Sequence, residues 1–458
     1  MSRIYAIEVE DNHLKGNKSD FDDGFDEVSS ILEIEQERIK QVQLFDQRME
    51  SFKDIVMNNS RTAVSFKSIL YGLGSVVLPL IFVCFLTLIP VHNAILYPQY
   101  WYEGVLAGPI INTLLIPAYI VFNCSFWMNN AQIRKIKVYL MLCSVGLLAL
   151  TITIVGVHSL WFYFGYQPPV AYGGLISGYS IIIVLYICLW FYFPQKWRSD
   201  VAFRRRLIYF FISIFFSQLV VIQFNMITKG LLMIDRKYQW IIALTLPLFR
   251  ELNNWAMVRL ASKASNGDLQ SIELTCTHIM GTRYSLFLTI ALGSIATLES
   301  GLVIFISDFV FNSYVCLKIV RGKRKNTLSI DKQIKLLQEL TINETVEIVT
   351  PLLYFLSFCT AYFGPNVEII GNIGSSKWQY IAIDNVESTM LAIFLFFTVD
   401  LLSAIVSAFV LWKFASINLY RAFSRIQEEF GFCFIINNSC LFFIVSNIYF
   451  LILEGYLD

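Results

Sequence analysis

The chain has 458 residues, of which 56% are hydrophobic and 15% are charged, and its formal net charge is +1. Soluble domains carry about 25% charged residues, so this composition argues against an ordinary soluble globular protein. The charge is unevenly spread, because residues 1–65 hold 14 acidic and 8 basic side chains and the remaining bases lie in short connections. Such bases predict membrane topology rather than a surface for nucleic acid.

The N-terminal segment divides into two predicted parts. Residues 1–25 are acidic and contain Gly, Asn and Ser, so we expect a disordered tail. Residues 26–65 carry apolar side chains three and four positions apart, which predicts an amphipathic helix on the cytosolic side of a membrane. The apolar members of this pattern are Val42, Phe45, Met49, Phe52 and Val56.

From about residue 66 onward, long uncharged stretches alternate with short charged connections. Residues 69–90, 104–129, 138–193 and 207–228 contain no charged side chain. A stretch of about 20 apolar residues crosses a hydrocarbon core as a helix, the structure in which such a segment satisfies its own backbone there. The sequence therefore predicts an all-α protein whose residues 66–458 form one polytopic transmembrane helical bundle.

The number of crossings depends on two regions. Trp240–Phe249 provides only ten apolar residues before Arg250, and Leu286–Val320 is too long for one ordinary span and is interrupted at Glu299. If both regions add crossings the total is eleven; if the first does not cross and the second is one tilted helix, the total is nine. The other predicted spans are 69–90, 104–124, 138–160, 173–193, 207–228, 346–363, 390–412 and 431–453.

The distribution of Lys and Arg predicts the orientation. Residues 91–103 and 159–172 contain neither, whereas 125–137, 194–206 and 318–325 are rich in them. Basic connections stay in the cytosol, so we expect a cytosolic N-terminus and a C-terminus on the outer side. This orientation requires an odd number of crossings.

Charged side chains within the apolar stretches are the first candidates for a functional site, because each costs roughly 2.5–3.5 kcal/mol at the centre of a membrane helix. Asp400 lies near the middle of a predicted span and either pairs with a base or binds an ion or proton. Asp308 lies within a second apolar stretch, where it can pair with Arg250. Glu347 begins the predicted span 346–363, where a helix N-terminus favours an acid in any case.

The densest polar group comprises Arg250, Glu251, Asn253 and Asn254. If 240–260 crosses the membrane, Pro247 interrupts the helix beside this group and the freed backbone helps to build a binding site. If the membrane ends at Phe249, the same residues begin an aqueous loop. The candidate residues for binding a solute or ion are Asp400, Arg250, Glu251, Asp308 and Asn254.

No catalytic or cofactor-binding motif accompanies these residues. The chain lacks HExxH, GxSxG, a P-loop and a Rossmann glycine pattern, and its four histidines and nine cysteines show no ligand spacing. We therefore predict no catalytic residue, metal or cofactor. The favoured function is transport of a small solute or ion through a polar path between helices. The alternative is a ligand-sensing membrane receptor or a subunit of a ligand-gated channel. The expected partners are the lipid bilayer and the transported species; homo-oligomerisation is left open and no nucleic acid is expected.

Overall fold

The computed structural model describes residues 52–56, 65–88, 101–127, 136–164, 170–265, 269–294, 298–363 and 386–453. It divides the chain into two units, 1–54 and 55–458. The described residues form helices and their connections, with no strand among them, so the predicted all-α class is confirmed. The predicted tail at 1–25 lies outside the described residues. So does most of the predicted helix at 26–65, of which 52–56 are helical and 65 precedes the next helix.

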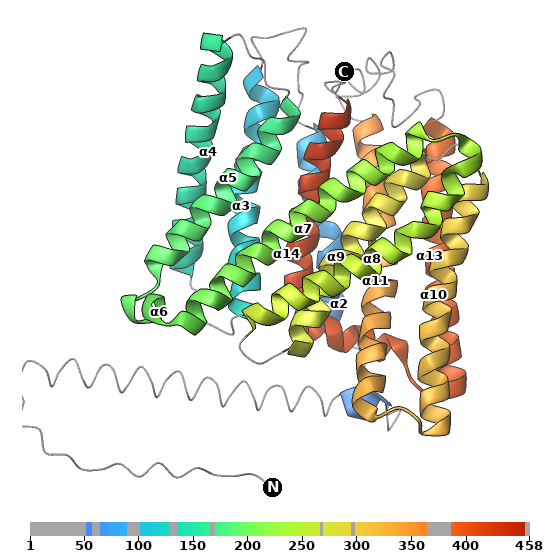
Figure 1. Cartoon of the computed structure of the whole chain (residues 1–458). Coiled ribbons are helices and arrows are strands. Elements are labelled where there is room, and N and C mark those ends of the chain that lie inside the picture. The colour runs from blue at the N-terminus through green and yellow to red at the C-terminus, as the bar shows by residue number, and fades with distance from the viewer. Residues whose placement is uncertain are drawn as a thin grey trace, which may run out of the picture. The chain divides into compact units, whose positions relative to one another are not determined.

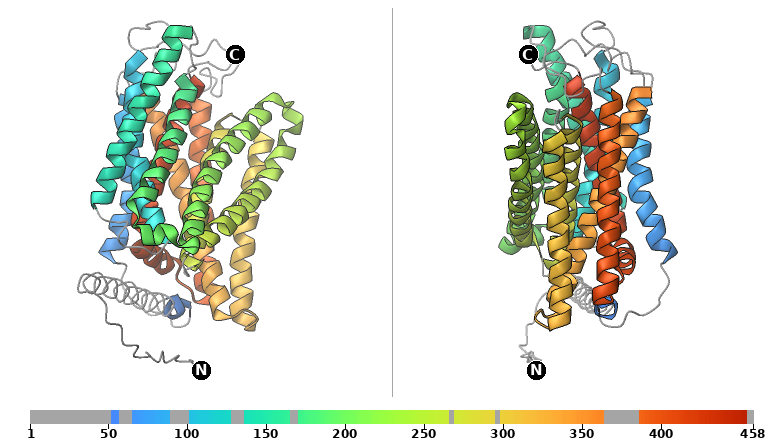
Figure 2. Two further views of the ribbon diagram at one scale, coloured as in Figure 1. Left: turned by 60° about the vertical axis from the view of Figure 1, so that its left-hand side comes forward. Right: turned by 90° about the vertical axis from the view of Figure 1, so that its right-hand side faces the viewer.

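In the part of residues 55–458 that the structure describes, eleven long helices pack into a bundle (Figures 1 and 2). Successive helices run antiparallel, so the first begins at one end of the bundle and the last ends at the other (Figure 1). The long helices are α2 (Phe66–Leu88), α3 (Trp101–Trp127), α4 (Ile136–Phe164), α5 (Val170–Tyr192), α7 (Val201–Met233), α8 (Gln239–Ala264), α9 (Leu269–Ser294), α10 (Leu298–Lys325), α11 (Ile330–Phe363), α13 (Val386–Ala415) and α14 (Leu419–Leu453). Two short helices, α6 (Gln195–Ser199) and η3 (Arg236–Tyr238), lie in the connections before α7 and α8.

Both regions that left the number of crossings open are helical. Helix α8 continues through Pro247 and Arg250, so the predicted interruption at Pro247 and the alternative of an aqueous loop from residue 250 are both wrong. A proline removes one backbone hydrogen bond of a helix, but the residues before and after Pro247 remain helical. The apolar stretch 286–320 is divided, because α9 ends at Ser294 and α10 begins at Leu298.

Several helices begin at a side chain that caps the first turn. Ser65, Asp200 and Asn418 each accept a hydrogen bond from the backbone N–H two residues later, at 3.2, 2.8 and 3.0 Å. Ser329 accepts one from the backbone N–H three residues later, at 3.4 Å. Serine, aspartate and asparagine are preferred at this position because their oxygens satisfy backbone donors that have no partner inside the helix. The starts of α2, α7, α11 and α14 are therefore specified by local sequence.

Large apolar side chains face outward over much of the bundle, and several polar side chains are buried inside it. Leu395, Leu402 and Phe409 of α13 are about half exposed, whereas Asp400 on the same helix is 5% exposed. Helix α9, by contrast, is rich in polar residues and lies inside the bundle. Its side chains from residue 271 to 289 are buried, except for the partly buried Glu273, and it packs against α3, α7, α8, α11, α13 and α14.

Two helices are individually long and apolar enough to cross a membrane. They are α7 over Val201–Phe224 and α13 over Met390–Ala415. Shorter apolar segments of 10–17 residues occur in α2, α3, α4 and α5, as far as the described residues extend. Length and composition therefore give a weak indication of membrane association at two helices.

Helices α2 and α14 approach each other closely. A Cβ atom added at Gly431 of α14 would lie 2.5 Å from Tyr71 Cβ of α2, so a larger residue there would force the two helices apart. Pro79 has no N–H to donate to the carbonyl of Ser75 one turn earlier. Asn438 Nδ2 of α14 donates to that carbonyl at 3.2 Å instead. A side chain of α14 thus replaces a backbone hydrogen bond that α2 lacks.

Candidate functional site

A buried ion pair joins α8 to α11. Arg250 Nη1 donates to Glu347 Oε1 at 3.0 Å, and the two side chains are 7% and 4% exposed. The other carboxylate oxygen of Glu347 accepts a hydrogen bond from Asn312 Nδ2 of α10 at 2.7 Å. The guanidinium of Arg250 also lies over the ring of Tyr284 in α9, 5.0 Å from its centroid. Four helices therefore meet around one pair of opposite charges.

The chemistry of this pair makes it sensitive to helix movement. An arginine side chain keeps its positive charge in proteins, so Arg250 needs an anion wherever water is excluded. Glu347 supplies that anion, and Asn312 adds a hydrogen bond to the carboxylate. Separating α8 from α11 would leave two uncompensated buried charges, which is strongly unfavourable. The pair can open only if water or another ion replaces the lost partner.

The structure describes the side chains of four of the five residues that the sequence selected. Arg250 belongs to the ion pair, whereas Glu251 is exposed on α8 and Asn254 is partly buried one turn further along. Asp400 is buried on α13. Asp308 belongs to α10, but its side chain lies outside the described ones, so its pairing with Arg250 stays a prediction. Of the five, Arg250 is the residue that the described contacts place at the centre of a charged site.

Helix α11 contributes two buried acids that the sequence analysis did not select. Glu347 was interpreted as an acid favoured by a helix N-terminus; this is wrong, because α11 begins at Ile330 and Glu347 lies well inside it. Glu344, one turn earlier, is 3% exposed and accepts a hydrogen bond from Ser407 Oγ of α13 at 2.8 Å. Because the predicted span begins at residue 346, it leaves Glu344 outside the helix and places Glu347 at the helix start.

Helix α9 carries a buried polar stripe that sequence reasoning also missed. Six polar residues recur at spacings of 4, 3, 4, 3 and 4, which places them on one face of a helix. Three threonine hydroxyls in the stripe donate to the backbone carbonyl four residues earlier, at 2.9, 2.7 and 2.7 Å. This spacing is visible in the sequence and is the signal that identifies the face. The stripe consists of Ser271, Thr275, His278, Thr282, Ser285 and Thr289.

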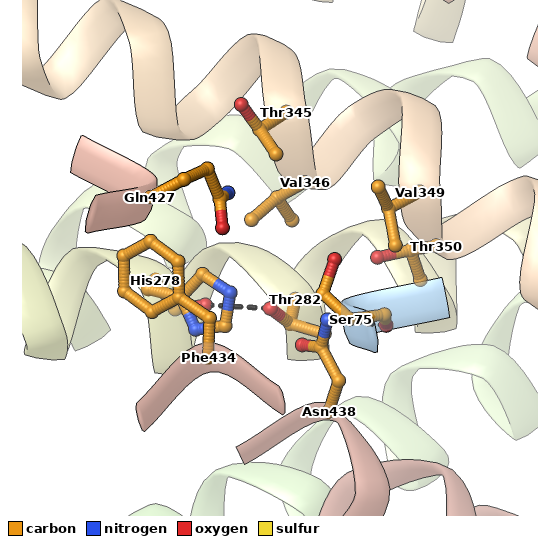
Figure 3. A pocket seen from close by; sticks show the side chains of 10 residues that line it. All are labelled: Ser75, His278, Thr282, Thr345, Val346, Val349, Thr350, Gln427, Phe434 and Asn438. Carbon is orange, nitrogen blue, oxygen red and sulfur yellow. Dashed lines mark hydrogen bonds between the residues drawn. The ribbon is translucent and has the colours of Figure 1, made fainter. Parts of the chain in front are cut away.

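A small cavity lies where this stripe meets α2, α11 and α14 (Figure 3). The cavity has a volume of about 10 Å³, which is close to the space that one buried water needs. The ring of His278 stacks on Phe434 with centroids 3.8 Å apart and planes 4° apart. The polar side chains of the lining are Ser75, His278, Thr282, Thr345, Thr350, Gln427 and Asn438.

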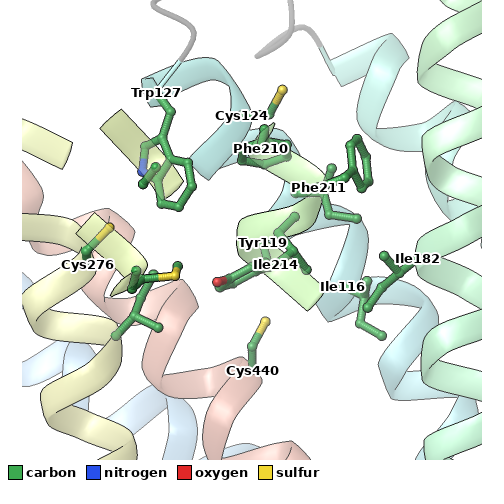
Figure 4. Close-up of a cluster of buried hydrophobic side chains, with 14 of the residues drawn as sticks. Ile116, Tyr119, Cys124, Trp127, Ile182, Phe210, Phe211, Ile214, Cys276 and Cys440 are labelled. Carbon is green, nitrogen blue, oxygen red and sulfur yellow. The ribbon is translucent and has the colours of Figure 1, made fainter. Parts of the chain in front are cut away.

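A large apolar cluster also includes residues of α9. Aromatic, aliphatic and sulfur-containing side chains from α3, α5, α7, α9 and α14 form the cluster in Figure 4. Trp127 of α3 meets Phe210 of α7 edge to face, with ring centroids 5.3 Å apart. Cys276 and Cys440 are buried in the same cluster, where they pack as small apolar residues. In the described part of the chain, no group of three His, Cys, Asp or Glu residues is placed to hold a metal ion.

Comparison with known protein families, with curated proteins and with solved structures found no match to this chain. Its function must therefore be inferred from the site itself.

Proposed function

We propose that this protein crosses the membrane many times and moves a small ion or solute along a polar path through the centre of its helical bundle. The observation that carries the proposal is the buried Arg250–Glu347 pair inside a bundle whose outer side chains are largely apolar. In water the opposite distribution is expected, because apolar burial drives folding and charges stay at the surface. A lipid environment accounts for both halves of the observation.

Length and exposure support many crossings. Each long helix has at least 23 residues, which at about 1.5 Å per residue exceeds a hydrocarbon core about 30 Å thick. Helix α4, for example, exposes Ile136, Leu140, Leu148 and Ile152. Helix α9 carries several polar residues along its length, but it packs against six other helices. A helix shielded from lipid in this way needs no apolar surface of its own.

The basic connections support one orientation. The start of α4, the start of α7 and the end of α10 share one end of the bundle (Figure 1), and each of these helix ends carries Lys or Arg residues. The positive-inside rule assigns that end to the cytosol. Eleven crossings then place the N-terminus in the cytosol and the C-terminus outside. Epitope tags at the two termini should respond from opposite faces of intact cells, and responses from the same face would contradict this topology.

The polar path is formed by side chains that are charged at depth. Buried charges in membrane proteins mark pathways for ions and substrates. Arg250 and Glu347 close the path between α8 and α11, Glu344 lies one turn from Glu347, and Asp400 lies on the neighbouring α13. A charged cargo passes this level by competing for one partner of the ion pair, an anion for Arg250 or a cation for Glu347. This competition links movement of the cargo to movement of the helices.

The test is a flux measurement in reconstituted liposomes. Gradients of H⁺, Na⁺, K⁺ and Cl⁻ are imposed in turn on the wild-type protein and on the Arg250→Gln and Glu347→Gln variants, with Lys335→Gln as a surface control. We expect flux of at least one ion in the wild type and in the control, and its loss in both site variants. Unchanged flux in the site variants would refute the assignment of the path. A current that appears only after a ligand is added would favour the receptor or channel alternative.

A further inference from the structure

Four buried polar atoms at the cavity on α9 have no hydrogen-bond partner among the described residues. They are His278 Nδ1, Thr350 Oγ1, Gln427 Oε1 and Asn438 Oδ1, and each side chain is at most 3% exposed. They come from α9, α11 and α14 and surround the same space (Figure 3). Unpaired buried polar atoms are rare, because each has given up its hydrogen bonds to water. Four of them around one cavity indicate a shared ligand.

The hydrogen-bonding capacity of these atoms defines that ligand. Asn438 already donates to the carbonyl of Ser75, so it presents an acceptor oxygen to the cavity, as does Gln427. The hydroxyl of Thr350 is available as a donor, and a neutral imidazole donates from Nδ1 in one of its two tautomers. The site therefore offers two acceptors and two donors. The hydroxyls of Ser75 and Thr282 add no donor to this count, because each already donates its hydrogen to a backbone carbonyl.

We propose that this cavity binds one water molecule with four hydrogen bonds. The water donates to Gln427 Oε1 and Asn438 Oδ1, and it accepts from the Thr350 hydroxyl and from His278 Nδ1–H. The volume of about 10 Å³ suits a single water, and buried waters typically make about three such bonds. Immobilising one water costs less than leaving four buried polar atoms unpaired.

The lack of a negative charge at the cavity argues against a bound cation. No carboxylate is among the described residues that line the cavity. The nearest acids along α11 are Glu347, which is paired with Arg250, and Glu344, which bonds to Ser407. A buried cation without a facing anion is much more costly than a neutral ligand of the same size. The ligand is therefore neutral, and at this level α9, α11 and α14 are joined through water.

Two valine substitutions on α11 test the proposal without requiring transport activity. Thr350→Val removes a donor to the water, whereas Thr345→Val removes a hydroxyl of the same cavity that already donates to the Thr341 carbonyl. In a denaturant titration of the detergent-solubilised protein, we expect Thr350→Val to raise the unfolding constant about three- to tenfold relative to Thr345→Val. If the cavity were dry, Thr350→Val would remove an unpaired polar atom and stabilise the fold. That sign would overturn the proposal.

Two further measurements cover a variant that fails to fold. The ¹⁵N spectrum of histidine-labelled wild-type protein, assigned with a His278→Phe variant, should show a protonated Nδ1 at His278, and an unprotonated Nδ1 would contradict the proposed bonds. Thermal unfolding in NaCl, KCl and choline chloride at equal ionic strength should give the same midpoint. A sodium-selective increase that disappears in Gln427→Leu would identify a cation site and overturn the assignment of water.

Discussion

Replacing one partner of the Arg250–Glu347 pair should destabilise the fold more than replacing both. Arg250→Met leaves a carboxylate buried without its cation, and Glu347→Met leaves a guanidinium without its anion. Breaking a buried pair in this way costs about 3–5 kcal/mol. The double variant leaves no buried charge at the pair; its remaining losses are the hydrogen bond that Asn312 donates to Glu347, about 1 kcal/mol, and the contact of the guanidinium with the ring of Tyr284. The expected coupling between the two sites is therefore several kcal/mol.

A matched surface pair provides the control for this cycle. Lys335 Nζ of α11 lies 2.6 Å from Glu273 Oε2 of α9, but the two side chains are 47% and 29% exposed. Exposed pairs contribute at most about 1 kcal/mol, so Lys335→Met and Glu273→Met should have small effects. Tryptophan fluorescence during denaturant titration in detergent measures both cycles. If the buried single variants cost no more than the surface ones, or if the buried double variant costs the sum of its singles, the reasoning is refuted.

Three other substitutions test separate contacts. Gly431→Val places a side chain against Tyr71 and should lower the free energy of unfolding by about 1–3 kcal/mol through overpacking. The measurement is a lower unfolding temperature, and an unchanged temperature would contradict the close approach of α2 and α14. Ser407→Ala removes the hydrogen bond to Glu344 and should cost about 1–3 kcal/mol in the same titration, whereas no loss would mean that the carboxylate has another donor. Asp400→Asn should abolish ion flux while surface expression stays normal, and full flux would remove Asp400 from the path.

The positions of most helices follow from uncharged stretches, but their lengths do not. The predicted span 346–363 is the last part of α11, which begins at Ile330. The span predicted at 431–453 likewise forms the second part of α14, which begins at Leu419. Charged residues such as Glu, Lys and Arg form helices readily. The absence of charge therefore identifies the apolar part of a helix but not the polar part that continues it.

The candidate site was predictable only in part. Arg250 and Asp400 stand out because each interrupts an apolar stretch, and the structure buries both. The partner of Arg250 was not predictable, because Glu347 is 97 residues away in the chain and becomes adjacent only through the packing of α8 on α11. His278 was set aside as one of four scattered histidines. Its significance depends on the polar stripe of α9, which an apolar pattern cannot reveal.

Helix α9 connects the two parts of the site. Tyr284 lies beneath the guanidinium of Arg250, and Thr282, two residues earlier, lines the polar cavity. Residues two apart lie on nearly opposite faces of a helix, because each residue turns about 100°. A rotation or axial shift of α9 would therefore change the contacts of the ion pair and of the cavity together. In the proposed transport function, this arrangement allows the opening of a charged pair on one face to alter a polar cavity on the other.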